Sequence, residues 1–329
     1  MSKMRQMPLV QLSTLGDVIN AIISLASNVC RGPEFIHLVL DSYVEMSLKE
    51  GERLWRSDEV AGIDIIGMGR DTPISKQFDK FWASEANKRK LQLLVRDIVC
   101  NQACVHPTII ASSVVSDDEA LPAIASGNEE IPELLNWIEK ADARFVAHVE
   151  WAVRVKQSQR VVVMSNDTDT FALLLHFTPH FQALGLKEIW QPYGTGEKRR
   201  MLPLHQAIAQ LKTPLAKTMI KAHILTGDDC MSKVETKHAA VACDPIQYLT
   251  NFGETEQDEA LAEKYLVRVW AGDRSTTTTE TFDQLRLENY TSASAGIDFL
   301  PPTSSVIKGH IRRGAFLVHN ALKAACEYR

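Results

Sequence analysis

The spacing of apolar and polar residues predicts a chain in which helices alternate with strands. Apolar side chains recur at helical spacing over 12–30, and the short apolar run FIHLVLD (35–41) predicts a buried strand that ends in an acid. The segment RVVVMS (160–165) predicts the clearest central strand, because it is β-branched, unbroken and followed by the polar tract NDTD. The segments LKEIWQPY and EKRRMLPL flank residues 194–196 and predict a β-hairpin.

Most of the remaining chain has a helical pattern. Residues 75–104 and 131–156 predict long helices, HPTIIASSVV (106–115) predicts another strand, and the Gly- and Asp-rich stretch 57–73 predicts a loop. Nearly every segment after residue 203 predicts a helix. We therefore expect an α/β fold with a mostly parallel central sheet, helices on both faces of that sheet, and a helical C-terminal part.

Length, cysteine use and charge narrow the class of protein. The chain has 329 residues, and because its first residues, MSKMRQMPLVQLSTLGD, lack the apolar run of a secretory signal, we expect no such signal. No apolar run approaches the roughly 18 residues of a membrane span. Six scattered cysteines fit a reducing compartment, so we expect an intracellular address, nuclear or cytoplasmic, and no membrane partner. The net charge of −5 argues against a predominantly basic surface. It does not exclude nucleic acid as a partner, because a metal site built from carboxylates contributes negative charge itself.

Acidic residues stand where the predicted strands end. Asp41 closes the first strand, and Asp167 and Asp169 follow the RVVVMS strand. Glu139 and Asp142 lie on the predicted helix that leads into that strand. Ligands of open α/β sheets bind at the carboxyl ends of the strands, and carboxylates that converge there repel one another unless cations are bound. Hard oxygen ligands of this kind suit Mg²⁺ or Mn²⁺.

Each of these acids also has a structural explanation. A lone Asp at the end of a strand is usually a turn residue or a helix cap, and Asp167 could cap the helix that begins with FALLLHF. Glu139 and Asp142, three residues apart, could form a solvated helix face. Asp228 and Asp229 could be turn residues after a glycine. The order of the acids along the chain favours the functional interpretation.

That order resembles the motif series of a nuclease family. FIHLVLD, LK…R…R, EKADAR, VVVMSNDTDTFALLL and ILTGDDCMSKVETKHAA are similar to the flap-endonuclease and 5′-to-3′ exonuclease family, a branch of the PIN-like nucleases. They look more closely like uncharacterised PIN-like proteins of animals, often transposon-associated. The resemblance implies a PIN-like, flap-endonuclease-like core over 1–225, in which 57–130 matches the arch region. It also implies a helical region over 226–329 that includes a helix-hairpin-like segment, 226–242.

The resemblance assigns roles to individual residues. Its implied metal ligands are Asp41, Glu139, Asp142, Asp167, Asp169 and Asp229. Lys49 and Arg56 resemble the catalytic basic pair that polarises the scissile phosphate. Lys233 and Lys237 match residues that contact the phosphates of nucleic acid, although Glu235 departs from the family pattern between them.

The activity implied by the resemblance is hydrolysis of phosphodiester bonds in DNA or RNA with two Mg²⁺ or Mn²⁺ ions. One departure concerns the family's earlier strand, which ends in a metal-binding Asp and has no counterpart before 12–30. Asp17 stands in the first turn of a predicted helix, where the helix dipole alone explains an acid. We therefore expect a weak, structure-specific nuclease. The alternative is a catalytically inactive PIN-like module that binds nucleic acid or protein.

Overall fold

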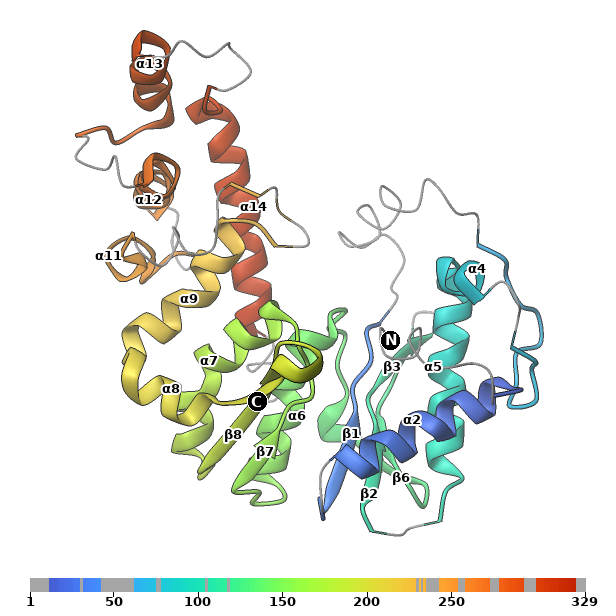
Figure 1. Cartoon of the computed structure of the whole chain (residues 1–329). Coiled ribbons are helices and arrows are strands. Elements are labelled where there is room, and N and C mark those ends of the chain that lie inside the picture. Colours follow the sequence, from blue (N-terminus) through green and yellow to red (C-terminus); the bar gives the residue numbers. More distant parts are fainter. Residues whose placement is uncertain are drawn as a thin grey trace. The chain divides into compact units, whose positions relative to one another are not determined.

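The computed structural model of the chain consists of two compact units, Met1–Arg144 and Phe145–Glu327, and each has its own apolar core (Figure 1). The division falls within helix α6 (Ala141–Arg154). No helix among the described residues is long and apolar enough to cross a membrane. The structure describes residues 12–29, 32–42, 62–74, 78–103, 106–116, 119–228, 231, 233–234, 243–253, 258–272, 278–292 and 300–323.

The first unit is built on a four-stranded mixed sheet. Its elements before α6 are α2 (Leu15–Val29), β1 (Phe35–Leu38), α4 (Phe78–Ala83), α5 (Glu85–Cys100), β2 (Thr108–Ala111), β3 (Val114–Ser116), β4 (Glu119–Leu121), β5 (Ala123–Ala125), β6 (Glu129–Ile131) and the 3₁₀ turn η2 (Pro132–Leu134). The strand order is β1-β2-β5-β6, and β1 pairs in parallel with β2, with Phe35 opposite Thr108. Strands β3 and β4 form a further antiparallel pair.

Side-chain caps explain where helices α2 and α5 begin. The Asp17 carboxylate accepts hydrogen bonds from Ser13 N (3.1 Å) and Thr14 N (2.9 Å), and Thr14 Oγ1 accepts one from Asp17 N (3.2 Å). This reciprocal cap satisfies backbone donors at the start of α2. Ser84 separates α4 from α5 and caps α5 by accepting from Asn87 N at 3.1 Å. Helix α5 then packs on β2 and β5, and α2 packs on α5.

The second unit combines a three-stranded sheet with a largely helical remainder. Its elements after α6 are β7 (Arg160–Val162), α7 (Thr168–Ala183), β8 (Glu188–Tyr193), the 3₁₀ turn η3 (Gly196–Lys198), β9 (Arg200–Pro203), α8 (Leu204–Leu211), α9 (Thr213–Leu225), α11 (Pro245–Leu249), α12 (Glu259–Ala271), α13 (Phe282–Ser292) and α14 (Ser304–Lys323). Strand β7 is parallel to β8, and β8 is antiparallel to β9. The helical tail predicted after residue 203 is confirmed.

Helix α9 is central to the packing of this second unit. It contacts α7 and α8, the helices that adjoin strands β7, β8 and β9 in sequence, and it also contacts α11 and α14 in the helical part (Figure 1). Helix α8 packs on the hairpin of β8 and β9. Close approach of α14 to the end of α9 depends on Gly314, where an added Cβ would lie 3.0 Å from Leu225 Cδ2. The start of α7 and the end of α9 therefore belong to one packed core.

The predicted α/β class is confirmed, but the expectation of a mostly parallel sheet is wrong for the strands that the structure describes. Within the units, β1–β2 and β7–β8 are parallel, and the other described pairings are antiparallel. The reason is clearest between β5 and β6, where Gly127 (φ 89°) and Asn128 (φ 66°) form a tight turn. Such a short connection can join only antiparallel strands. The hairpin predicted around 194–196 is confirmed.

The helix predicted over 131–156 is wrong in its first part. Ile131 ends β6, η2 follows, and residues 135–140 precede the start of α6 without regular structure. Pro132 explains the interruption, because it lacks an N–H and disfavours helical geometry at the residue before it. Glu139 therefore lies before α6 rather than on it, so Glu139 and Asp142 do not share a helix face.

The predicted strand at 106–115 is divided into β2 and β3, and the following polar passage contributes strands β4, β5 and β6. Part of the range 57–130 thus belongs to the sheets of the first unit. The arch-like role of that range, and the family-based limits 1–225 and 226–329, stay predictions.

Candidate functional site

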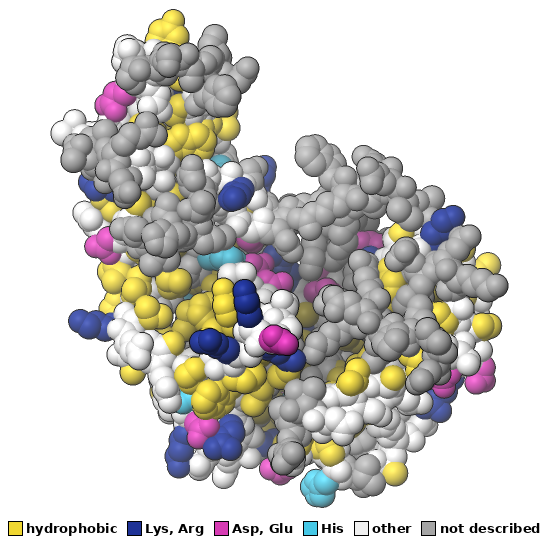
Figure 2. All heavy atoms as spheres, viewed as in Figure 1, with side chains coloured by type: hydrophobic (Ala, Val, Ile, Leu, Met, Phe, Trp, Pro, Cys, Tyr) yellow, Lys and Arg dark blue, Asp and Glu magenta, His cyan; other side chains and the backbone are white. Residues whose placement is uncertain are grey.

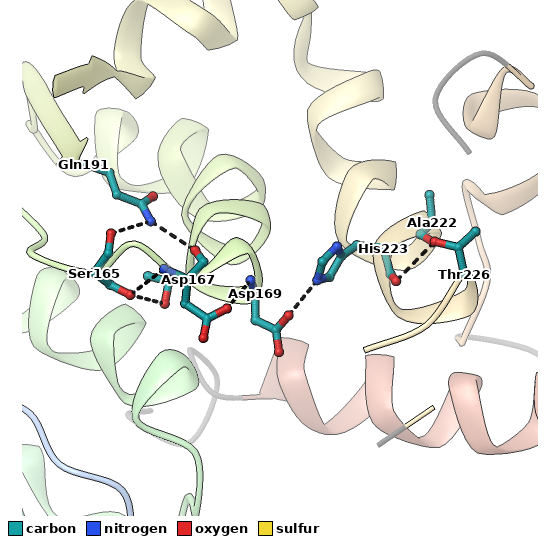
Figure 3. A network of polar contacts seen from close by, with 8 residues as sticks. Ser165, Asp167, Asp169, Gln191, Ala222, His223 and Thr226 are labelled. Atoms are coloured by element: carbon teal, nitrogen blue, oxygen red, sulfur yellow. Dashed lines mark hydrogen bonds and ion pairs between the residues drawn. The ribbon is translucent and has the colours of Figure 1, made fainter. Parts of the chain in front are cut away.

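Polar side chains gather in the second unit where the chain leaves β7 and enters α7 (Figure 3). Asp167 is the N-cap of α7, and its Oδ1 accepts a hydrogen bond from Asp169 N at 3.0 Å. Ser165 Oγ accepts from Asp167 N at 3.1 Å, which tightens the turn before the helix. Figure 3 shows the carboxylates of Asp167 and Asp169 on the same side of this loop. The sequence NDTD thus supplies both the cap and a pair of neighbouring acids.

A buried amide holds this acidic loop in place. Gln191 on β8 is 2% exposed, and its Nε2 donates to the carbonyl oxygens of Ser165 (3.0 Å) and Asp167 (3.2 Å). Asn166 Nδ2 reaches Gly194 O in the neighbouring hairpin at 3.4 Å. Because a buried N–H group costs free energy unless it is hydrogen-bonded, the Gln191 amide nitrogen holds the loop against the sheet, and the exposed Asn166 adds a longer contact. Sequence reasoning did not identify Gln191, since nothing in its local pattern marks it.

The shortest polar contact of the site joins Asp169 to a histidine on another helix. His223 lies in the last turn of α9, and its Nε2 is 2.6 Å from Asp169 Oδ1. The His223 side chain is 9% exposed and that of Asp169 is 17% exposed. The carboxylate is the acceptor, so the imidazole donates the proton from Nε2. Sequence reasoning missed His223, although its position just before the LTGDD motif is a signal that could have suggested it.

Asp228 lies beyond the end of α9, near α14. His310 on α14 is within hydrogen-bond distance of Leu225 O (2.8 Å) through its Nε2. Burial lowers the pKa of His310, and Arg313 lowers it further, whereas the Leu225 carbonyl and the negative charge of Asp228 act in the opposite direction. Asp228 is thus close enough to influence the partly buried imidazole of His310.

In the first unit, the predicted acids lie around the start of α6. Asp41 Oδ1 accepts from Ala141 N at 2.9 Å, so the carboxylate caps the first turn of a helix one hundred residues away in the chain. Ser42 N donates to Glu139 O at 2.8 Å. Asp142 stands in the first turn of α6. The segment after β1 is therefore bound to the segment that carries the other two acids.

Arg144 anchors this arrangement from inside the core. Its side chain is 0% exposed, and it donates to Leu40 O (3.0 Å), Ser113 O (2.7 Å) and Ile138 O (2.6 Å), as well as to Ser42 Oγ. One guanidinium thus joins the ends of β1 and β2 to the segment before α6, which fixes the backbone on both sides of Asp41.

The remaining predicted site residues have different outcomes. Lys49, Arg56, Asp229 and Lys237 lie outside the described residues, and Lys233 is described and exposed. Asp17 caps α2, which is the structural role expected of an acid in a first helical turn, and the hydrogen bonds from Ser13, Thr14 and the Thr14 hydroxyl lower its pKa.

Convergence of the six predicted metal ligands stays a prediction. Asp41, Glu139 and Asp142 belong to the first unit, and Asp167 and Asp169 belong to the second. In the part of the chain that the structure describes, no group of three or more His, Cys, Asp or Glu side chains is arranged to hold a metal ion.

The described Lys and Arg side chains on the face shown in Figure 2 stand in small groups among apolar and acidic ones, and they do not form a continuous basic surface. Comparison with models of protein families, with curated proteins and with solved structures gives no match.

Proposed function

We propose that this chain is a divalent-metal-dependent nuclease with a PIN-like, flap-endonuclease-like fold, acting on DNA or RNA in the nucleus or the cytoplasm. The observation that supports this most is the pair Asp167 and Asp169 at the carboxyl end of β7, held on one side of a loop by Gln191. Asp167 is the N-cap of α7, and Asp169 lies in the first turn of that helix. Ionised oxygens in a fixed loop are what a hard cation requires.

The donor atoms fit Mg²⁺ or Mn²⁺. Asp167 is exposed, Asp169 is partly exposed, and both offer carboxylate oxygens, which these ions prefer. In the proposal Asp229 belongs to the same ligand set. Two bound ions would supply an activated water and stabilisation of the leaving oxygen.

The basic residues of the chain have separate roles in the proposal. Lys49 and Arg56 neutralise charge that develops on the scissile phosphate, which stabilises the transition state. Lys233, which is exposed, and Lys237 hold the phosphate backbone of the substrate away from the reacting bond.

A second candidate function is a PIN-like module that binds nucleic acid or protein without cleaving it. This candidate is favoured because several of the acids cap helices. Asp41 caps α6, Asp167 caps α7 and Asp17 caps α2, so each would be retained for helix stability without any metal.

Cleavage of defined substrates distinguishes these two candidates. The full chain is incubated with labelled single-stranded, duplex and flapped DNA and RNA, in Mn²⁺, in Mg²⁺ or with chelator. The nuclease proposal expects slow cleavage that requires the metal and is lost in Asp169→Asn. Glu133→Gln, an exposed acid in η2, is the matched control and should retain the rate. Binding without cleavage in wild type, under every metal condition, would favour the module instead.

A further inference from the structure

The contact between His223 and Asp169 is unusual among the polar contacts of this loop, because it crosses from one helix to another. Asp169 belongs to the first turn of α7, whereas His223 belongs to the last turn of α9, 54 residues later. Their polar atoms are 2.6 Å apart, and both side chains are largely shielded from water. A charge-assisted hydrogen bond at this distance and burial is stronger than one between neutral, exposed groups.

Helix α9 gives His223 a fixed position. The helix packs along α7, and its end is stabilised by Thr226, whose Oγ1 donates to Ala222 O at 2.8 Å. Leu225, in the same turn, is fully buried and meets α14 near Gly314. The imidazole therefore approaches Asp169 from a rigid element, so it can restrict the rotation of the carboxylate.

We propose that His223 is the positioning residue of the Asp169 metal ligand. This inference rests on the proposed metal-dependent function and adds a residue outside the predicted ligand set. By donating to Oδ1, His223 fixes the plane of the carboxylate and directs its other oxygen toward the ion. Hydrogen-bonded partners of metal ligands act in this way, and their loss typically weakens metal affinity by about 10–100-fold.

The test is the affinity of the full chain for Mn²⁺, measured by electron paramagnetic resonance of the free aqueous ion. Because the contact uses Nε2, a glutamine can place its own amide N–H at a similar reach, whereas an asparagine is too short. His223→Gln should keep the wild-type affinity within about threefold, and His223→Asn and His223→Leu should lose tenfold or more. His176→Leu is the matched control, because His176 also links α7 to α9, through Lys217 O at 3.1 Å, and should leave Mn²⁺ affinity unchanged.

The outcomes separate this inference from the proposed function. Wild-type Mn²⁺ affinity retained in His223→Asn would overturn the inference and leave the metal site standing. Equal losses in His223→Gln and His223→Asn would also overturn it, because the hydrogen bond would then not be what matters. Absence of Mn²⁺ binding in wild type would overturn both the inference and the metal site. Melting in chelator provides the check that each variant is folded, so a purely structural role would lower the melting temperature without changing the affinity of the folded chain.

Discussion

Replacing Arg144 by methionine tests how the end of β1 is held. Methionine has a similar length but no donor, so the change removes every hydrogen bond of the guanidinium while filling much of its space. The change removes the donor from four acceptors, which are the backbone carbonyls of Leu40, Ser113 and Ile138 and the Ser42 hydroxyl. All of these contacts surround a side chain that is fully buried.

The expected destabilisation follows from two opposing contributions. Each buried acceptor left without a donor costs about 1–3 kcal/mol, so four of them would cost far more than a typical point mutation. Removing the guanidinium also removes its desolvation cost, which is several kcal/mol for a buried charge. Four neutral acceptors at about 2 kcal/mol each, reduced by about 4 kcal/mol of relieved desolvation, give an expected net loss of about 3–5 kcal/mol for Arg144→Met.

Hydrogen exchange of backbone amides measures this loss of stability in the segments that Arg144 joins. Peptides that cover β1, β2 and the start of α6 should exchange at least about 100-fold faster in Arg144→Met, since each 1.4 kcal/mol corresponds to a factor of ten. Arg160→Met is the control, because Arg160 is 70% exposed and solvent screens its bidentate pair with Glu188, so exchange in this variant should stay close to that of wild type. An effect of Arg144→Met within 1 kcal/mol of this control would refute the reasoning.

Further outcomes are expected at three other places. Asp167→Ala should destabilise the chain by about 1 kcal/mol through loss of the α7 cap, whereas Asp167→Asn should keep stability in denaturant unfolding yet lose Mn²⁺ binding. Burial lowers the pKa of His37 to about 4, below its unfolded value of 6.5, so stability should be complete above pH 6.5 and fall as the pH drops toward 4, by about 3 kcal/mol. His37→Phe should flatten that dependence in unfolding measured across this pH range. On α14, Gly309→Ala, where the added Cβ meets nothing within 4 Å, should stabilise by about 0.5–1 kcal/mol, and Gly314→Ala should be at least about 1 kcal/mol worse in thermal melting.

The elements that sequence pattern predicts well are those with an unambiguous local signal. The hairpin around 194–196 forms as expected. The RVVVMS segment also forms a strand, but the strand is limited to Arg160–Val162 and lies at the edge of the described three-stranded sheet, so its predicted central position is wrong. The three-residue strands β4, β5 and β6 are too short to show a period, so they were not predicted. Apolar residues of 131–138 continue the helical spacing of α6, and this pattern outweighed the signal of Pro132.

The candidate site is predictable only in its local part. Asp167 as a helix cap follows from its place after a strand and before an apolar run, and the structure confirms that interpretation. Gln191 and His223 reach the acidic loop through tertiary packing, from elements 24 and 54 residues away, so no spacing rule connects them to it. The same holds for Asp41, whose helix partner Ala141 is one hundred residues distant.

Calorimetric titration of the full chain with Mn²⁺ tests the central claim most directly. In the proposal the acids after β7 hold a divalent ion, and binding of that ion to the folded state also stabilises it by mass action. Wild type should bind Mn²⁺ at or below millimolar concentration and melt at a higher temperature when the ion is present. The double variant Asp167→Asn with Asp169→Asn, which keeps the cap but removes both charges, should show neither effect. Undetectable binding to wild type at millimolar Mn²⁺, or equal binding to the double variant, would contradict the account.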